Sequence, residues 1–414
     1  MAPAAGCVIV GGGAAGAATV AALRDGAYAE PITLIGAEAE LPYDRPPLSK
    51  GYLQGKSGLA EVFLHDLRWY DQRDVRLLVG SAVSEIDLGS RQVKLGPREA
   101  IGYDQLVLAT GATPQRPDLP GADLPGVLCL RTLADSDRLR DRMAEANRVV
   151  VIGGGWIGLE VTAAARAVGL PVTVLETAPL PLMRVLGEWM APVFADLHRK
   201  QGVDLRVGVE VSAITGDRFA TGVRLADGTR LSGDLIVLGV GATANTELAQ
   251  RAGITVEDGI RTDAGLRTSA PDVYAVGDVA RADHPLYGCP LRVEHWDNAH
   301  HQPETAAAAI LGRRAVHDAV PYFFTDQYDL GMEYGGYLMP DRKHRVVVRG
   351  DLAGREFIAF WQDPAGRLVA GMNVNVWDVN DTIRALIAER RPLDRDRLAD
   401  PGVPLTDLLE PGRS

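Results

Sequence analysis

The feature of this sequence that most constrains its fold is a glycine-rich segment that occurs twice. Residues 8–16 read VIVGGGAAG, and residues 150–158 read VVIGGGWIG. In each copy a short β-branched run leads into glycines with the spacing G-x-G-x-x-G, and an alanine-rich stretch of helical character follows. Strand, tight turn and helix in this order are typical of a dinucleotide-binding unit. Because the motif and its flanks occur twice, we expect two such units.

Each glycine of the motif has a separate physical role. Gly11 permits a tight turn, Gly13 lets the backbone approach a pyrophosphate, and Gly16 lets the helix pack closely on the strand. The start of the helix then offers free N–H groups and partial positive charge to the phosphates. The second copy repeats the pattern at Gly153, Gly155 and Gly158.

A second pair of similar segments indicates the domain organisation. Residues 107–114 read VLATGATP, residues 237–244 read VLGVGATA, and strand-like sequence returns at 273–280. The last part of the chain has short strand patterns before a helix at about 380–391. We predict an α/β fold with two Rossmann-like dinucleotide-binding domains, one inserted in the other, and a C-terminal α+β domain. The predicted boundaries are 1–112 and 246–320 for the split first domain, 113–245 for the inserted domain and 321–414 for the last.

The nucleotide preference of the second unit depends on Glu176. This residue ends the predicted strand 171–176, 23 positions after Gly153, close to the spacing of a carboxylate that binds a ribose 2′-hydroxyl. A carboxylate there repels a 2′-phosphate, so we expect NADH rather than NADPH; a solvated strand end is the alternative. Arg184 could oppose this preference by contacting phosphate, or could simply lie on the surface. In the first unit Glu38 is the corresponding carboxylate, at a longer spacing.

Composition excludes several classes of protein. The 414 residues carry a net charge of −11, which argues against binding nucleic acid or an anionic membrane through bulk charge. The apolar run from Cys7 to Leu23 is shorter than a membrane span and lacks a basic flank, so we expect a cytoplasmic protein. The cysteines Cys7, Cys129 and Cys289 are odd in number and far apart, so neither a disulfide framework nor a C-x-x-C redox pair is expected. No metal site is predicted.

Several further motifs resemble one family, the FAD-dependent NADH–ferredoxin reductases that serve bacterial haem-thiolate monooxygenases and Rieske dioxygenases. The motifs are PYDRPPLSKGYL at 42–53, LATGATP at 108–114, YAVGD at 274–278, RVEHWDNA at 292–299, PYFFTDQYDLG at 321–331 and VRGD at 348–351. The resemblance extends over nearly the whole chain. It implies a glutathione-reductase-like fold with FAD in the split domain, NADH in the inserted domain and the C-terminal domain beside the flavin.

The resemblance also implies the binding residues. Asp278 is expected to bond the ribityl chain of FAD, and Glu160 to lie near the nicotinamide. Candidate FAD contacts are Gly11, Gly13, Ala14, Ala15, Gly16, Ala37, Glu38, Arg45, Lys50, Val83, Ala109, Thr110, Gly111, Arg131, Gly277, Asp278, Glu294, His295, Trp296 and Phe324. Candidate NAD contacts are Gly153, Gly155, Trp156, Ile157, Gly158, Glu160, Glu176, Arg184, Gly239 and Gly241.

The expected reaction is hydride transfer from NADH to FAD, with the protein supplying position and electrostatics. Lys50 and Glu160 are the catalytic candidates and are expected to pair near flavin N5, since a buried lysine needs such a partner to stay charged; a lysine bonded only to a backbone carbonyl is the alternative. A helix beginning near residues 296–298 could stabilise charge on the reduced flavin. Because residues 36–60 contain no cysteine, we expect electrons to leave the flavin directly for a small acidic iron–sulfur protein, a 2Fe-2S ferredoxin.

Three positions depart from the family pattern. Ala37 stands where an acidic residue is usual, and Phe324 replaces a common tryptophan. Pro303 falls inside a stretch that the family makes helical, so we expect a late helix start or a kink.

Two other functions stay open. A rubredoxin reductase or general NADH-dependent diaphorase would use the same motifs with another electron acceptor. A redox-sensing signalling flavoprotein is a different class, against which the acidic composition argues. We expect a monomer or a weak homodimer.

Overall fold

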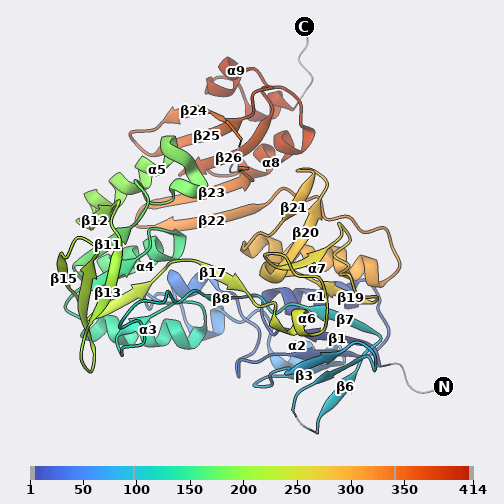
Figure 1. Cartoon of the computed structure of the whole chain (residues 1–414). Helices are drawn as coiled ribbons and strands as arrows, with labels where there is room; N and C mark the ends of the chain where they lie inside the picture. The colour runs from blue at the N-terminus through green and yellow to red at the C-terminus, as the bar shows by residue number, and fades with distance from the viewer. Residues whose placement is uncertain (1–4, 97, 340–341, 410–414) are drawn as a thin grey trace. The chain divides into compact units, whose positions relative to one another are not determined.

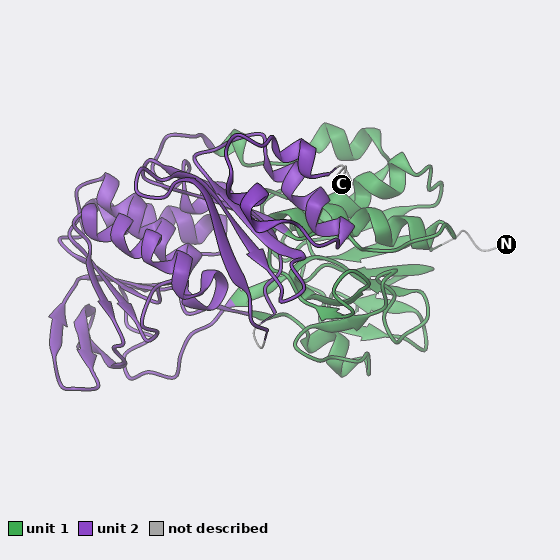
Figure 2. Ribbon diagram, turned by 90° about the horizontal axis from the view of Figure 1, so that it is seen from above, with its two compact units in different colours: residues 1–44, 59–113, 243–321 green, residues 45–58, 114–242, 322–414 purple. Residues whose placement is uncertain are grey.

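The structure is a computed structural model that describes residues 5–96, 98–339 and 342–409 (Figure 1). The chain divides into two compact units (Figure 2). Unit 1 comprises residues 1–44, 59–113 and 243–321, and unit 2 comprises residues 45–58, 114–242 and 322–414. The chain therefore passes between the units five times. The finer division into three domains predicted above stays a prediction.

A parallel five-stranded sheet forms the centre of unit 1, in the order β19-β7-β1-β2-β3. Its strands are β1 (Cys7–Val10), β2 (Ile32–Ile35), β3 (Val75–Leu78), β7 (Gln105–Leu108) and β19 (Val273–Ala275). β1 pairs in parallel with β2 and with β7, so it is central to the sheet. All four of its residues are buried, as the near-continuous apolar run predicts for a strand that is covered on both faces.

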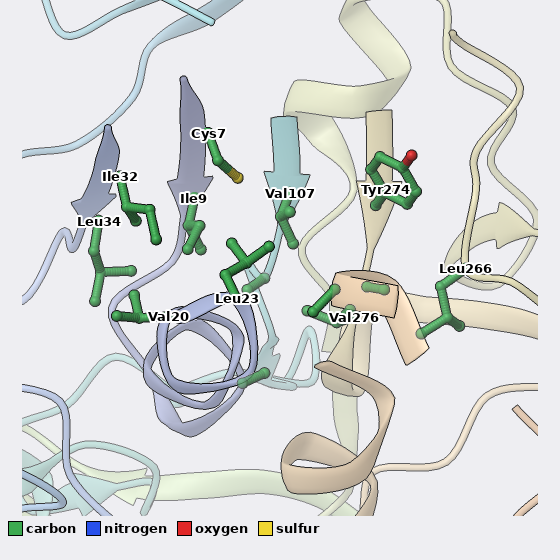
Figure 3. Packing of buried hydrophobic residues seen from close by; sticks show 14 of the residues in the cluster. Cys7, Ile9, Val20, Leu23, Ile32, Leu34, Val107, Leu266, Tyr274 and Val276 are labelled. Carbon is green, nitrogen blue, oxygen red and sulfur yellow. The ribbon is translucent and has the colours of Figure 1, made fainter. Parts of the chain in front are cut away.

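The core of unit 1 lies on both faces of this sheet. Side chains alternate along a strand, so Cys7 and Ile9 join a buried cluster that includes Leu23 of helix α1 (Ala14–Asp25), as Figure 3 shows. Val8 and Val10 belong to a second cluster, which contains residues of β4 (Glu85–Asp87) and β5 (Gln92–Lys94). These two clusters fix the end of β1, from which the first glycine turn starts.

Helix α7 (Trp296–Ile310) packs against α1 and completes the first cluster. α7 begins at Trp296 and continues through Pro303, so the expected late start is wrong. The alternative expectation, a kink at Pro303, stays a prediction. Pro303 is buried in the interior of the helix, where its missing N–H costs one hydrogen bond of the helix.

The remaining elements of unit 1 are short. They are η2 (Leu59–Glu61), α2 (Leu67–Gln72), β6 (Ala100–Gly102), α6 (Glu247–Arg251), β18 (Ile260–Thr262), η3 (Gly277–Val279), β20 (Ala280–His284) and β21 (Cys289–Leu291). β8 (Ala112–Pro114) and β17 (Ala242–Ala244) contain two of the points where the chain passes from one unit to the other.

Unit 2 contains a second parallel five-stranded sheet, in the order β12-β11-β10-β16-β9. Its strands are β9 (Val127–Leu128), β10 (Val149–Ile152), β11 (Val172–Glu176), β12 (Asp204–Val207) and β16 (Leu235–Leu238). Its helices are α3 (Leu133–Glu145), α4 (Trp156–Ala167) and α5 (Met183–Lys200), and the 3₁₀ turn η1 (Pro46–Ser49) contacts α3 and α4. A small antiparallel sheet comprises β13 (Val211–Gly216), β14 (Ala220–Leu225) and β15 (Arg230–Ser232).

The C-terminal part of unit 2 is an antiparallel sheet in the order β22-β23-β26-β25-β24. Its strands are β22 (Tyr322–Gln327), β23 (Leu330–Gly336), β24 (Arg345–Asp351), β25 (Glu356–Gln362) and β26 (Leu368–Val374), followed by α8 (Asn380–Glu389), α9 (Arg395–Ala399) and η4 (Leu405–Leu408). The predicted helix at about 380–391 is confirmed as α8. Across the described ranges, no helix is both long and apolar enough to cross a lipid bilayer.

Candidate functional site

The first glycine turn, in unit 1, leaves an open space in front of helix α1. Gly11 has φ of 126°, and a Cβ there would lie 2.1 Å from the carbonyl oxygen of Ala109. A Cβ at Gly16 would lie 2.0 Å from the carbonyl oxygen of Gly11. A Cβ at Gly13, in contrast, would meet no heavy atom within 4 Å, and no side chain caps the start of α1. Free N–H groups beside open space suit a pyrophosphate, so the turn fits FAD.

The second glycine turn, in unit 2, repeats this geometry. Gly153 has φ of 108°, and a Cβ there would lie 2.3 Å from the carbonyl oxygen of Gly239. A Cβ at Gly158 would lie 2.3 Å from the carbonyl oxygen of Gly153, whereas one at Gly155 would make only an ordinary contact at 3.8 Å. No side chain caps the start of α4. The same features therefore suit the pyrophosphate of a second dinucleotide.

Glu176 lies at this second turn, at the end of β11. Its Oε2 accepts a hydrogen bond of 2.7 Å from the N–H of Gly154, and its Oε1 accepts one of 2.8 Å from the N–H of Ala178. The carboxylate is thus fixed beside the glycine backbone, where the ribose of a bound nucleotide is expected. Arg184 is exposed on the first turn of α5.

In unit 1 the residues at the corresponding place are Ala37 and Glu38. Ala37 is exposed, whereas Glu38 is half-buried and accepts a hydrogen bond from the hydroxyl of Tyr43. Glu38 is therefore the residue that presents a fixed carboxylate after β2.

The predicted flavin residues of the G-D pair lie beside α1. Gly277 has φ of 74°, and a Cβ there would lie 2.9 Å from the Cβ of Ala15. Its N–H donates to Oε1 of Gln302 on α7 at 2.8 Å. This places Gly277, and with it Asp278, next to the first turn of α1. The structure thus brings Ala15 and the G-D pair together.

The loop after β7 is held by Asn245. The hydroxyl of Thr110 donates to the carbonyl of Asn245 at 2.7 Å, and the side-chain amide of Asn245 donates to the carbonyl of Thr110 at 2.8 Å. The N–H of Asn245 also donates to the carbonyl of Gly111 at 2.9 Å. These bonds fix Ala109, Thr110 and Gly111 against the first glycine turn, because the Ala109 carbonyl faces Gly11.

Other predicted flavin residues of unit 1 have local partners. Val83 packs against the second hydrophobic cluster, and Glu294 accepts a hydrogen bond from Arg292. The indole N–H of Trp296, at the start of α7, donates to Asp44 at 2.8 Å. His295 is the N-cap residue of α7 and is half-buried. The predicted helix start near residues 296–298 is therefore confirmed, and what these residues bind stays a prediction.

The predicted pair of Lys50 and Glu160 is present in unit 2. Nζ of Lys50 lies 2.8 Å from Oε1 of Glu160, whose side chain is only 4 % exposed. Glu160 is the fifth residue of α4, about one helical turn beyond the glycine turn. The ammonium of Lys50 also lies 5.3 Å from the ring centroid of Phe324, a cation–π distance. A cation and an aromatic ring are thus placed close to the second nucleotide turn, within one unit.

Two partners of Glu160 were not predicted from the sequence. The hydroxyl of Ser49 donates to Oε2, and the hydroxyl of Thr325 donates to Oε1 at 2.6 Å. Both belong to segments that the family resemblance covers, LSK and FFTDQY. Burial was the available signal: Thr325 occupies an inward position of β22, where the strand alternation expects an apolar residue.

The remaining predicted residues of unit 2 are placed as follows. Arg45 donates from Nη1 to the carbonyl of Arg131 at 2.5 Å. Trp156 begins α4, and its ring centroid lies 5.0 Å from that of Phe323. Ile157 is 44 % exposed at the same helix start. Gly241 has φ of 112°, and its carbonyl accepts from the N–H of Gln115 at 2.9 Å.

The three cysteines are all free. Cys7 is buried in β1, and burial raises the pKa of its thiol to about 12, so it is held as a thiol rather than a thiolate. Among the described residues there is no group of three or more His, Cys, Asp or Glu side chains that could hold a metal ion. The cysteines form no disulfide with one another, and neither glycine turn contains a cysteine.

Known proteins share this architecture. Residues 6–303 match the pyridine nucleotide-disulphide oxidoreductase family, and residues 322–409 match the family of reductase C-terminal domains. The chain belongs to the pyridine nucleotide-disulphide oxidoreductase family. This membership confirms the predicted fold class and the resemblance read from the motifs.

Two curated members of the oxidoreductase family illustrate how far the similarity extends. The ferredoxin–NAD(+) reductase component of the anthranilate 1,2-dioxygenase system of Burkholderia cepacia is 38% identical over 404 residues, covering 97% of this chain and 98% of that protein. Putidaredoxin reductase of Pseudomonas putida is 37% identical over 408 residues, covering 97% and 96%. Among solved structures, the covalent putidaredoxin reductase–putidaredoxin complex matches with a TM-score of 0.93, 36% identity and 98% coverage of each chain.

Proposed function

We propose that this protein is an FAD-dependent NADH:ferredoxin oxidoreductase. It takes a hydride from NADH and passes single electrons to a small acidic 2Fe-2S ferredoxin, which feeds an oxygenase. The observation that carries the proposal is similarity along nearly the full length of both chains to reductases that are named for a ferredoxin or putidaredoxin partner. It covers both glycine turns and the C-terminal sheet.

The proposed roles divide between the two units. In unit 1 the turn from Gly11 to Gly16 and Asp278 hold FAD. In unit 2 the turn from Gly153 to Gly158 holds NADH, and Glu176 binds its ribose. FAD, when bound, accepts a hydride and releases its two electrons one at a time. The chain supplies orientation and charge, and we assign the catalytic role to the Lys50–Glu160 pair, whose ammonium is held in place by the buried carboxylate.

The free cysteines support direct transfer from the flavin to the partner. A disulfide relay needs two thiols close together and a low thiol pKa. Cys7 and Cys129 are buried, and burial raises the pKa of both thiols. We also propose a cytoplasmic location, since free cysteines are typical of a reducing compartment.

The proposal is tested with the purified yellow holoprotein. Anaerobic NADH should bleach the flavin absorbance within one turnover, and NADPH should act at least tenfold less efficiently. Steady-state NADH oxidation should accelerate on addition of a co-encoded 2Fe-2S ferredoxin and much less on addition of rubredoxin. Rapid NADH oxidation with rubredoxin alone would move the assignment to rubredoxin reductase, and failure with every iron–sulfur protein would leave a diaphorase. Slow bleaching with a long-lived NAD complex would indicate a sensing flavoprotein instead.

A further inference from the structure

Strand β22 carries two polar side chains on its buried face. Thr325 and Gln327 are each 1% exposed, although their positions alternate with outward residues as core positions do. A buried hydroxyl or amide without a partner is costly, so such residues are expected to be hydrogen-bonded. The hydrogen-bond partners of Thr325 and Gln327 therefore indicate the role of these two side chains.

The two side chains belong to a continuous run of hydrogen bonds within unit 2. Thr325 donates to Oε1 of Glu160 at 2.6 Å, and Nε2 of Gln327 donates to the Thr325 hydroxyl at 3.2 Å. Nε2 of His198, on α5, lies 2.8 Å from Oε1 of Gln327. The hydroxyl of Tyr328 lies 3.1 Å from Nδ1 of His198. The run therefore links α5 to the carboxylate on α4 through β22.

Glu160 sets the direction of every bond in this run. A carboxylate only accepts, so the proton of the Thr325 hydroxyl is committed to Glu160. Thr325 must then accept from the amide group of Gln327, which leaves the Gln327 oxygen to accept from His198. His198 consequently carries its proton on Nε2 and accepts the Tyr328 proton on Nδ1.

The burial of His198 agrees with this direction. His198 is fully buried, and burial lowers its pKa to about 4, so the ring is neutral at physiological pH. A protonated ring would donate from both nitrogens and could not accept from Tyr328. The ring is also enclosed by the edge of Tyr328, with centroids 5.2 Å apart.

We infer that Thr325, Gln327 and His198 are positioning residues, a one-directional donor chain that holds the carboxylate of Glu160 against Lys50. The inference rests on the proposed function, in which this ion pair serves hydride transfer. Ser49 fixes one oxygen of the carboxylate, and Lys50 and Thr325 share the other. Without the Thr325 hydroxyl the carboxylate keeps Ser49 and Lys50 but loses one of three bonds, so its orientation and that of the ammonium are held less firmly.

The kinetic test compares Thr325→Val, which keeps the shape and removes the hydroxyl, with Thr325→Ser, which keeps the hydroxyl. In anaerobic stopped-flow mixing of the holoprotein with NADH, Thr325→Val should lower the limiting rate of flavin reduction about tenfold. The Kd for NADH should stay within about twofold, because no nucleotide contact is lost. Thr325→Ser should restore the rate to within about twofold of the unmodified protein.

A second measurement, made without NADH, detects the direction of the hydrogen bonds in this run through the tautomer of His198. In holoprotein labelled with ¹⁵N-histidine, the His198 signals, identified by their loss in His198→Gln, should show a protonated Nε2 and an unprotonated Nδ1. Because Thr325→Val cuts the link that fixes the direction, it should shift both ¹⁵N signals toward the average of two tautomers. Thr325→Ser should leave them in place.

The outcomes separate cleanly. Loss of rate in Thr325→Val, recovery in Thr325→Ser and a mixed tautomer in Thr325→Val alone support the inference. An unchanged rate, an equal loss in both variants, or a His198 tautomer that ignores Thr325→Val overturns it. Failure of the proposed function looks different: NADH then leaves the flavin of the unmodified protein oxidised, while the tautomer measurement still reports on the chain.

Discussion

At the scale of single residues, Glu176 combines two tasks. Its two carboxylate oxygens accept from the N–H groups of Gly154 and Ala178, so it holds the turn in shape. In the proposed function it also places a negative charge where a 2′-phosphate would lie. Truncation to alanine would remove both contributions together. Glutamine keeps the size and one of the two acceptor oxygens, so it removes the charge and one of the two backbone hydrogen bonds.

Glu176→Gln should lower the preference for NADH over NADPH. The ratio of the two kcat/KM values should fall about tenfold, because the repulsion of the phosphate is removed while ribose binding is partly kept. Glu145→Gln makes the same change of net charge on an exposed side chain at the end of α3 and is the matched control. A ratio that falls equally in both variants, or in neither, contradicts the assignment of Glu176.

The residue scale is also where sequence reasoning was least complete. Lys50 and Glu160 were predicted as a pair, because the family resemblance names both. Ser49 and Thr325 were not, since they lie 111 and 165 residues from Glu160 in the chain. No periodicity connects such positions. Only the buried face of β22 brings Thr325 to the carboxylate, and the sequence shows no more than a polar residue where an apolar one is expected.

At the scale of elements, the two strand–turn–helix segments were predicted well. β1 and α1 occupy Cys7–Val10 and Ala14–Asp25, on either side of the glycine turn, in the predicted order of strand, turn and helix. Short-range rules govern such a segment: apolar runs make the strand, glycine makes the turn, and alanine favours the helix. α7 was predicted less well, because packing on α1 stabilises the helix through Pro303. Local rules do not include that packing energy.

The first glycine turn allows a clean separation of folding from binding. Gly13→Ala places a Cβ where no protein atom lies within 4 Å, and the residue has φ of −90°, which alanine adopts freely. The free energy of unfolding of the apoprotein should therefore change by less than about 0.5 kcal/mol. The Kd for FAD should rise at least tenfold, because the methyl group fills the space for the pyrophosphate. Urea unfolding of the apoprotein and FAD titration measure the two effects.

Gly11→Ala is the contrasting variant. Its Cβ would lie 2.1 Å from the Ala109 carbonyl oxygen at φ of 126°, so it should destabilise the apoprotein itself. If Gly13→Ala destabilises the apoprotein as much as Gly11→Ala does, the space in front of α1 is not a ligand site.

At the scale of the whole molecule, buried histidines couple stability to pH. His198 in unit 2 and His317 in unit 1 each have a pKa lowered to about 4, chiefly by burial. The folded value lies below the unfolded value of about 6.5, so between these limits the unfolded chain binds more protons. The free energy of unfolding therefore rises with pH through this window. The contribution of these histidines is lost as the pH falls from about 6.5 toward 4.

The expected size is about 2 kcal/mol per histidine at pH 5 relative to pH 8. Urea unfolding of the unmodified protein and of His198→Gln at both pH values isolates the contribution of His198, since other groups titrate equally in both proteins. The loss on going to pH 5 should be smaller in His198→Gln by about 2 kcal/mol. Equal losses would show that His198 is not buried as a neutral ring.

The repeated passage of the chain between the two units has a consequence for biosynthesis. β19 pairs with β7, so the sheet of unit 1 lacks that strand until residues 273–275 have left the ribosome. Adding residues 109–272 takes about 10–30 s at ~5–20 residues per second. During this time the unpaired N–H and C=O groups of β7 can form hydrogen bonds with strands of other chains. A nascent chain of this design therefore exposes an unpaired strand edge for longer than a chain whose domains emerge one after the other.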